Sequence, residues 1–148
     1  MTMDLWEKFV EAAERHFRFL ETEFGFTRKS TTQPNVIYES GKIQVQVYYD
    51  ADGPHELDLG LRRLGDDPRK VPSVGLTAMM LLLDRQAAQQ SRAPFPSTEA
   101  SVENEVQRLA ELLRKYGSAF LKADEAAFER VERLRQEREK ELGGKNPC

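Results

Sequence analysis

The sequence predicts an α+β fold, in which an N-terminal helix precedes a three- to four-stranded antiparallel meander and three helices then pack on one face of the sheet. Apolar residues recur with a helical period over residues 4–24, alternate with the period of a strand over 26–64, and return to the helical period after residue 73. The length of 148 residues suits one domain with a single core. We therefore expect one domain over residues 1–148, with a flexible tail at 142–148.

The first helix is expected over residues 4–24. Asp4 is suited to cap its N-terminus, and Gly25 is suited to end it. Two adjacent stripes give the helix a wide apolar face, so it belongs to the core. These stripes contain Leu5, Phe9, Ala12, His16 and Phe19, and Trp6, Val10, Ala13, Phe17, Leu20 and Phe24.

Strands are expected over 26–31, 35–39, 42–49 and 55–64. The sequence ESGK at 39–42 predicts a two-residue hairpin loop with Glu39 opposite Lys42. In that register Tyr38 faces Ile43, so apolar residues meet apolar residues across the pair.

The turn residues DADGP at 50–54 predict the next hairpin, with Tyr49 opposite His55 and Val47 opposite Leu57. Both hairpins send the same residues of the middle strand inward, which gives the meander one apolar face and one polar face. The polar face is expected to carry Ile37, Glu39, Lys42, Gln44, Gln46, Tyr48, Glu56, Asp58, Gly60 and Arg62.

Three helices are expected after the sheet. The helix over 73–90 is apolar on nearly every side in its first half, a pattern typical of a helix that is buried between layers or covered by a partner. Ser97 or Thr98 is suited to cap the next helix, and Asp124 to cap the last one at 125–141. The helix that follows Thr98 has the clearest apolar stripe in the chain: Val102, Val106, Leu109, Leu113, Tyr116 and Phe120.

Side chains for catalysis are scarce. The two histidines are His16, on the apolar face of the first helix, and His55, beside the second turn. A packed core histidine and a strand-edge histidine explain these positions better than general-base roles. The sequence contains no nucleophile elbow, P-loop or dinucleotide fingerprint, so we expect no enzymatic activity and no cofactor.

Two charged clusters are better explained by solvation than by ligands. Asp50, Asp52, Glu56 and Asp58 gather near a turn, but their spacing departs from that of a calcium loop. The basic cluster at 62–70 contains acids that favour local salt bridges over phosphate binding. The single cysteine, Cys148, is explained as a tail thiol.

The net charge of −3 argues against a general nucleic-acid binder. The longest apolar run, at 74–83, is too short to cross a bilayer. We therefore expect a cytoplasmic protein with neither nucleic acid nor membrane as a partner.

The chain resembles small uncharacterised bacterial α+β proteins, some of which are associated with toxin immunity. The residues that carry the resemblance are a W-x-x-F helix (Trp6, Phe9) running into FLETEFGF at 19–26, the meander VIYESGKIQVQVYYD, and LAELLRKYGSAFL at 109–121. The resemblance implies a stoichiometric inhibitor whose acidic and polar surface covers a toxin. A net charge of −3 is compatible with a basic toxin nuclease. No family residue can be carried over, because no diagnostic motif is involved.

The polar face is the expected binding surface, because tyrosine and uncharged hydrogen-bonding groups at its centre and charges at its edges are typical of protein interfaces. An ordinary solvated sheet face is the alternative. The function expected is a non-catalytic protein-binding domain, and the second hypothesis is a small-ligand or regulatory module with a pocket between the sheet and helix 73–90. A homodimer through a sheet edge or the last helix is also open. The expected partner-binding residues are Ile37, Gln44, Gln46, Tyr48, Asp58 and Arg62.

Overall fold

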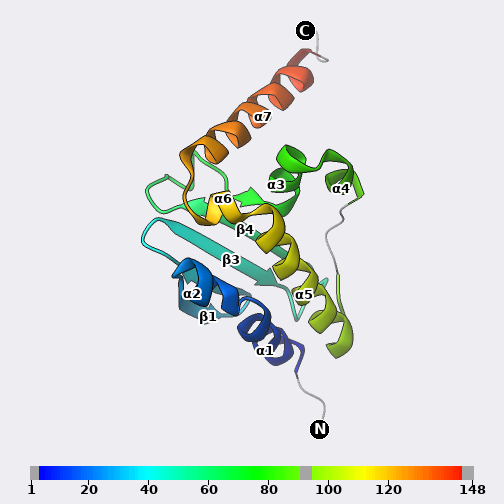
Figure 1. Cartoon of the computed structure of the whole chain (residues 1–148). Helices are drawn as coiled ribbons and strands as arrows, with labels where there is room; N and C mark the ends of the chain where they lie inside the picture. The colour runs from blue at the N-terminus through cyan, green and yellow to red at the C-terminus, as the bar shows by residue number, and fades with distance from the viewer. Residues whose placement is uncertain (1–3, 91–94, 145–148) are drawn as a thin grey trace.

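The computed structural model describes residues 4–90 and 95–144, without the side chains of residue 90 and residues 141–144. Five strands form one antiparallel sheet in the order β1-β2-β3-β4-β5, and helices precede and follow it (Figure 1). The strands are β1 (Thr27–Thr32), β2 (Asn35–Glu39), β3 (Ile43–Tyr49), β4 (Leu57–Arg63) and β5 (Val74–Gly75). The helices are α1 (Leu5–His16), α2 (Arg18–Phe24), α3 (Leu76–Leu83), α4 (Arg85–Gln90), α5 (Glu99–Tyr116), α6 (Ser118–Leu121) and α7 (Glu125–Gly144). The predicted α+β class and element order are confirmed.

The middle strand β3 divides the sheet into two faces. Its buried residues alternate along the whole strand with half-buried ones, as the pleat of a strand requires. Ile43, Val45, Val47 and Tyr49 are fully buried. Gln44, Gln46 and Tyr48 point to the opposite face, which is the face predicted to be polar.

The first hairpin differs from its predicted register by two residues. Glu39 lies opposite Gln44 instead of Lys42. The Ser40 hydroxyl accepts hydrogen bonds from the amides of Lys42 and Ile43, at 3.2 and 3.0 Å, so this side chain holds a wider loop than the predicted one. Because side chains repeat every two residues, each one keeps its predicted face.

The second hairpin is displaced by the same amount. Tyr49 lies opposite Leu57 instead of His55. His55 has a φ of 66°, in the left-handed region, and therefore belongs to the loop rather than to β4. Asp50 N–H closes this loop on the Glu56 carbonyl at 3.0 Å.

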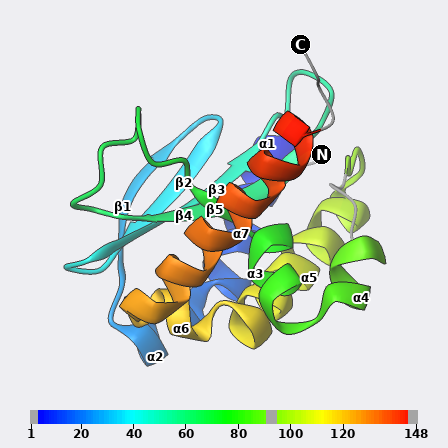
Figure 2. The ribbon, with the colours of Figure 1, turned by 90° about the horizontal axis from the view of Figure 1, so that it is seen from above.

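The helices pack on the apolar face of the sheet, as predicted (Figure 2). Two buried tyrosines on that face donate to main-chain carbonyls outside the sheet: Tyr38 to Ala13 of α1 at 3.4 Å, and Tyr49 to Pro96, in the segment before α5, at 2.7 Å. Burial raises the pKa of Tyr38 to about 12, and it also raises the pKa of Tyr49. The sheet and its helices therefore share one core.

The chain caps its helices largely as predicted. Asp4 accepts from the Trp6 amide, and Asp124 from the Ala126 amide. Gly25 ends α2 with a φ of 72°, which favours glycine. Thr98, rather than Ser97, caps α5 in a capping box.

Three of the predicted helices are interrupted. The first breaks at the buried Phe17, and the third breaks at Gly117. The predicted helix 73–90 breaks at Asp84, whose carboxylate accepts from the amide of Ala87 at 3.0 Å and from the hydroxyl of Tyr116 at 3.1 Å. These two bonds lower the pKa of Asp84. Asp84 is thus both the C-cap residue of α3 and, through its carboxylate, the N-cap of α4.

A fifth strand was not predicted. Residues 74–75 pair with β4 before α3 begins, with Gly75 opposite Gly60 and Val74 opposite Leu61. This segment is too short for a two-residue period to be visible in the sequence. The sheet therefore has five strands instead of the predicted three or four.

The last helix α7 is longer than predicted, because residues 142–144 are helical and only 145–148 of the predicted tail lie outside the described residues. Its outer part projects beyond the rest of the chain (Figure 1). Its inner part packs through Phe128, whose ring lies beneath the Arg63 guanidinium at 4.9 Å. Within the described residues, no helix is both long and apolar enough to cross a membrane.

His16 connects the first helix to α5. Its Nε2 lies 3.0 Å from Oε1 of Glu103, and Arg15 donates to the other oxygen of that carboxylate at 2.9 Å. Burial opposes ionisation of Glu103 most strongly. The His16 hydrogen bond and the charges of Arg15 and Lys8 nevertheless lower its pKa below the ordinary value. His16 is therefore hydrogen-bonded as predicted, but it is half-buried rather than packed within the core.

Leu61→Ala should lower the free energy of unfolding by about 2–5 kcal/mol, because Leu61 is 1% exposed on the apolar face. Ile37→Ala, on the polar face, should lower it by less than about 1 kcal/mol. Urea unfolding of the two variants measures this difference. Equal losses would contradict the assignment of the two faces.

The lowered pKa of Glu103 means that the folded protein favours the ionised carboxylate more than the unfolded chain does. This preference stabilises the fold when the pH is above the pKa of Glu103 in the unfolded chain. The stabilisation is lost as the pH falls through the pKa of Glu103 in the folded protein. The wild type should therefore lose more stability between about pH 5 and pH 3 than Glu103→Gln does. Glu7→Gln, at an exposed position of α1, should keep the wild-type pH dependence. Urea unfolding at a series of pH values tests this, and parallel curves for Glu103→Gln and the wild type would contradict it.

Candidate binding site

A row of hydrogen-bonded side chains crosses the polar face. Glu39, Gln44 and Arg62 lie directly opposite one another on β2, β3 and β4. Gln44 donates to Glu39 at 2.9 Å through Nε2 and accepts from Arg62 at 3.2 Å through Oε1. The central amide is thereby fixed in orientation, with a carboxylate on one side and a guanidinium on the other.

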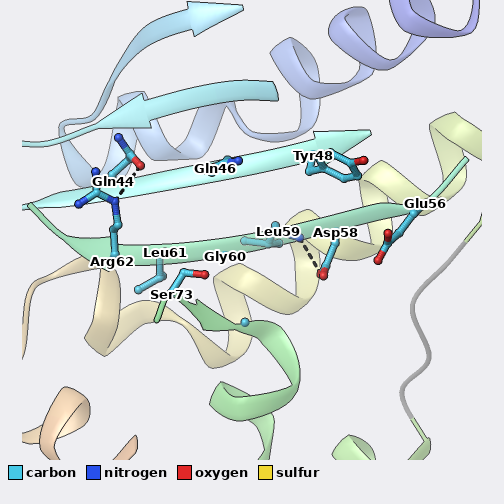
Figure 3. A pocket seen from close by; sticks show the side chains of 11 residues that line it. Gln44, Gln46, Tyr48, Glu56, Asp58, Leu59, Gly60, Leu61, Arg62 and Ser73 are labelled. Atoms are coloured by element: carbon cyan, nitrogen blue, oxygen red, sulfur yellow. Dashed lines mark hydrogen bonds between the residues drawn. The ribbon is translucent and has the colours of Figure 1, made fainter. Parts of the chain in front are cut away.

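The next row leaves a hollow. Gly60 lies between Gln46 on β3 and Gly75 on β5, so the β4–β5 side of this row carries no side chains. Ser73 stands beside the gap, and a Cβ added to Gly60 would meet its Oγ at 3.0 Å. The resulting hollow has a volume of about 350 Å³ and opens on the polar face (Figure 3).

Five of the six predicted partner-binding residues line this one hollow: Gln44, Gln46, Tyr48, Asp58 and Arg62. The sixth, Ile37, is not among its lining residues, but it lies opposite Gln46 on β2 and is half-buried on the same face. Prediction from the sequence therefore brought together residues that are adjacent in space. It did so despite the two-residue error in register, because that error keeps every side chain on its face.

Six lining residues were not among the predicted site residues: Glu56, Leu59, Gly60, Leu61, Ser73 and Gly75. The sequence places Glu56 and Gly60 on the polar face but outside the site, and Leu59 and Leu61 on the apolar face. It assigns Ser73 and Gly75 to a helix. The one sequence feature that points to a role for this segment in the hollow is Gly75, which interrupts the apolar run at 74–83. In the structure Gly75 pairs with Gly60, and the two glycines form the floor of the hollow.

Charge is separated along the hollow. Glu56 and Asp58 lie at one end, where Tyr48 is opposite Asp58, and Arg62 lies at the other end, with Gln46 between the two ends (Figure 3). The Asp58 carboxylate accepts the amide of Leu59 at 2.8 Å through Oδ1. Such a surface offers acceptors and an aromatic ring at one end, donors at the other and an amide in the middle, which suits recognition by hydrogen bonds and ion pairs.

The hollow contains a hydroxyl and carboxylates but no arranged nucleophile and base. Ser73 is exposed, and of the described residues that line the hollow none is a histidine, lysine or cysteine. His55 lies elsewhere, with its ring 6.3 Å from that of Tyr49. Its buried Nδ1 has no hydrogen-bond partner among the described residues, so no carboxylate orients the ring as a base.

The two charged clusters of the sequence are divided by the fold. Of the acids, Glu56 and Asp58 face the hollow, whereas Asp52 accepts from Gln33 at 2.8 Å in the loop. Within residues 4–90 and 95–144, no group of three or more His, Cys, Asp or Glu residues is arranged to hold a metal ion. Cys148 lies outside the described residues.

The basic cluster is split between two faces. Arg62 belongs to the hydrogen-bonded row on the polar face, whereas Arg63 bonds to Asp66 at 2.9 Å and to Glu125 at 2.8 Å. The hydrogen bond to Asp66 raises the pKa of Arg63. Arg63 therefore joins the end of β4 to α7, and among the described residues Arg63–Asp66 is the one local salt bridge of the kind expected for this cluster.

The row across the polar face can be tested by a double-mutant cycle between Gln44 and Arg62. The two alanine variants should show a coupling energy of about 0.5–1.5 kcal/mol in urea unfolding, because one hydrogen bond joins the side chains. A second cycle between Gln46 and Arg62 serves as the control, since Gln46 bonds to Asn35 instead, and it should give a value near zero. The same coupling in both cycles would contradict the specific pairing.

Comparison of the chain with protein-family models, with curated proteins and with solved structures gives no match. The likeness to immunity-type proteins therefore rests on the sequence segments alone. The functional argument rests on the polar face and its hollow.

Proposed function

We propose that this protein is a non-catalytic binding protein that recognises a protein partner through the polar face of its sheet. The observation that carries the proposal is the gathering of Gln44, Gln46, Tyr48, Asp58 and Arg62 around one hollow on the face opposite the helices. Side chains whose only role is solvation need not converge on a depression.

A protein partner fits this surface better than a deeply buried small ligand. The volume of about 350 Å³ lies near the lower end of the range for ligand sites, about 300–1,000 Å³. The hollow is also open, so it would leave much of a small molecule in water. A single side chain of a partner could fill it while the flat remainder of the face contacts the partner's surface.

The specific form that we propose is an immunity-type inhibitor. Glu56 and Asp58 would face basic side chains of the partner, and the net charge of −3 would speed encounter with a basic protein. Arg62 would then contact an acceptor at the other end of the hollow. This form rests on charge and on the resemblance of the sequence, and it is narrower than the general proposal.

A small-ligand module is the second candidate, and the hollow itself is the observation that favours it. Its position differs from the predicted one between the sheet and helix 73–90. That space contains the buried side chains of Leu76, Met79 and Met80, which belong to the common core. The hollow uses the same stretch of chain, but on the polar face, through Ser73 and Gly75.

The proposal predicts that a partner retained from a lysate of the source cells at fixed stoichiometry is lost in Gln46→Ala/Tyr48→Ala. This double variant removes an amide and an aromatic ring from the hollow without touching the core. Gln86→Ala/Gln136→Ala, at two exposed helical positions, is the matched control and should retain the partner. Affinity purification followed by mass spectrometry measures both.

Full retention by Gln46→Ala/Tyr48→Ala, with both proteins folded by circular dichroism, would contradict the proposed surface. Gly60→Val provides an independent variant, because it fills the floor of the hollow and keeps every polar side chain. If a small molecule, rather than a protein chain, is released from the wild type on denaturation and is absent from Gly60→Val, the second candidate replaces the first.

A further inference from the structure

The helix α3 has more apolar surface than the fold covers. Its sequence, LTAMMLLL, was the one stretch predicted to be either buried between layers or covered by a partner. Leu76, Met79 and Met80 are buried against the core. Leu83, at the end of the helix, is 59% exposed, whereas Leu81 and Leu82 are half-buried against the core, so the uncovered apolar surface of α3 lies at its C-terminal end.

A groove lies beside this uncovered surface. It has a volume of about 420 Å³, and α3, α5, α6 and α7 contribute to its walls. Leu82 and Leu83 form one apolar wall, while Ala119, Phe120 and Ala127 form the other. We call this hollow the α3–α7 groove. None of its lining residues belongs to the hollow on the polar face.

Three cations border the α3–α7 groove: Lys115, Lys122 and Arg130. All three are exposed, and within the described residues none of them makes an ion pair. Lys115 lies over the ring of Tyr116 at 5.1 Å. The one acid among the lining residues, Asp124, caps the N-terminus of α7. An apolar groove with a basic rim thus occurs on a chain whose net charge is −3.

The walls of the groove determine how a partner could bind there. They are built from helices, whose main-chain N–H and C=O groups bond within the helix, so a partner cannot add a strand. Binding must come from side chains: apolar ones that enter the groove and contact the exposed Leu83 above the buried Phe120, and acidic ones that meet the rim. A helix with an apolar stripe and acidic flanks presents both sets together.

We propose that the α3–α7 groove binds an amphipathic helix of a partner protein whose apolar stripe is flanked by acidic residues. This surface is distinct from the polar face, so the inference does not depend on the function proposed above. The charge of the rim selects the partner, and the exposed Leu83 at the end of α3 supplies the apolar contact.

The probe for this groove is a labelled synthetic peptide of about 18 residues, long enough to form a helix in isolation. It carries Leu at i, i+3, i+4 and i+7 and Glu on both flanks. One control peptide replaces each Glu by Lys. A second has the same composition, with its leucines spread around the helix. Fluorescence anisotropy with the full chain should show saturable binding of the acidic stripe peptide alone, with a Kd below about 1 mM.

Two variants assign the binding to the groove. Lys122→Glu/Arg130→Glu should raise the Kd of the acidic peptide at least about tenfold, because it reverses the charge of the rim. Leu83→Gln should also weaken binding and should fold normally, since Leu83 is exposed. Arg69→Glu/Lys70→Glu changes the net charge equally in an exposed loop away from the groove, and it should leave the Kd unchanged.

Three outcomes would overturn the proposal. The first is the absence of saturable binding below about 1 mM, and the second is equal binding of the acidic and basic peptides. The third is an equal effect of the groove and loop charge reversals. Sedimentation decides the remaining alternative: a wild-type dimer that Leu83→Gln dissociates would show that a second copy occupies the groove, in place of a partner helix.

Discussion

The pleat of β3 is the constraint on which the rest of the structure depends. Alternate side chains of this strand enter the core, and each apolar one contributes about 1.5–3 kcal/mol when it is fully buried. The intervening side chains are thereby forced onto the other face, whatever their own preferences. The polar row and the hollow exist because Ile43, Val45 and Val47 must be buried.

Two tyrosines complete the apolar face without leaving unsatisfied polar groups. Tyr38 and Tyr49 bury their rings among the helices and donate their hydroxyl groups to main-chain carbonyls. The sheet is thus bonded to α1 through Tyr38 and to the segment that leads into α5 through Tyr49, as well as packed against the helices. This leaves the polar face and the C-terminal end of α3 as the surfaces with features suited to recognition.

The two faces could be predicted from the sequence because burial has a period of two in a strand, and that period survives an error in loop length. The class of fold and the positions of Gln44, Gln46 and Tyr48 were therefore correct. Both hairpin registers were wrong by two residues, because the Ser40 hydroxyl and the left-handed backbone of His55 widen the loops. The contribution of Ser73 and Gly75 could not be predicted, since a two-residue strand has no periodicity and an apolar run can form either a helix or a strand. The helix breaks at Phe17 and Asp84 could not be predicted either, because helix propensity is a local preference that tertiary contacts override.

The register of the hairpins has a consequence for how this sheet can change over evolutionary time. Insertion or deletion of two residues in a hairpin loop can be absorbed when one strand slides by two positions, with no inward side chain turned outward. A single inserted residue must be taken up by a longer loop or by a bulge, such as the one between Arg28 and Ser30 in β1, because a one-residue slide would turn every side chain of the strand to the other face. The division of this sheet into two faces is thus compatible with loops of differing length, since either the loop itself or an even slide of the strand can take up the difference.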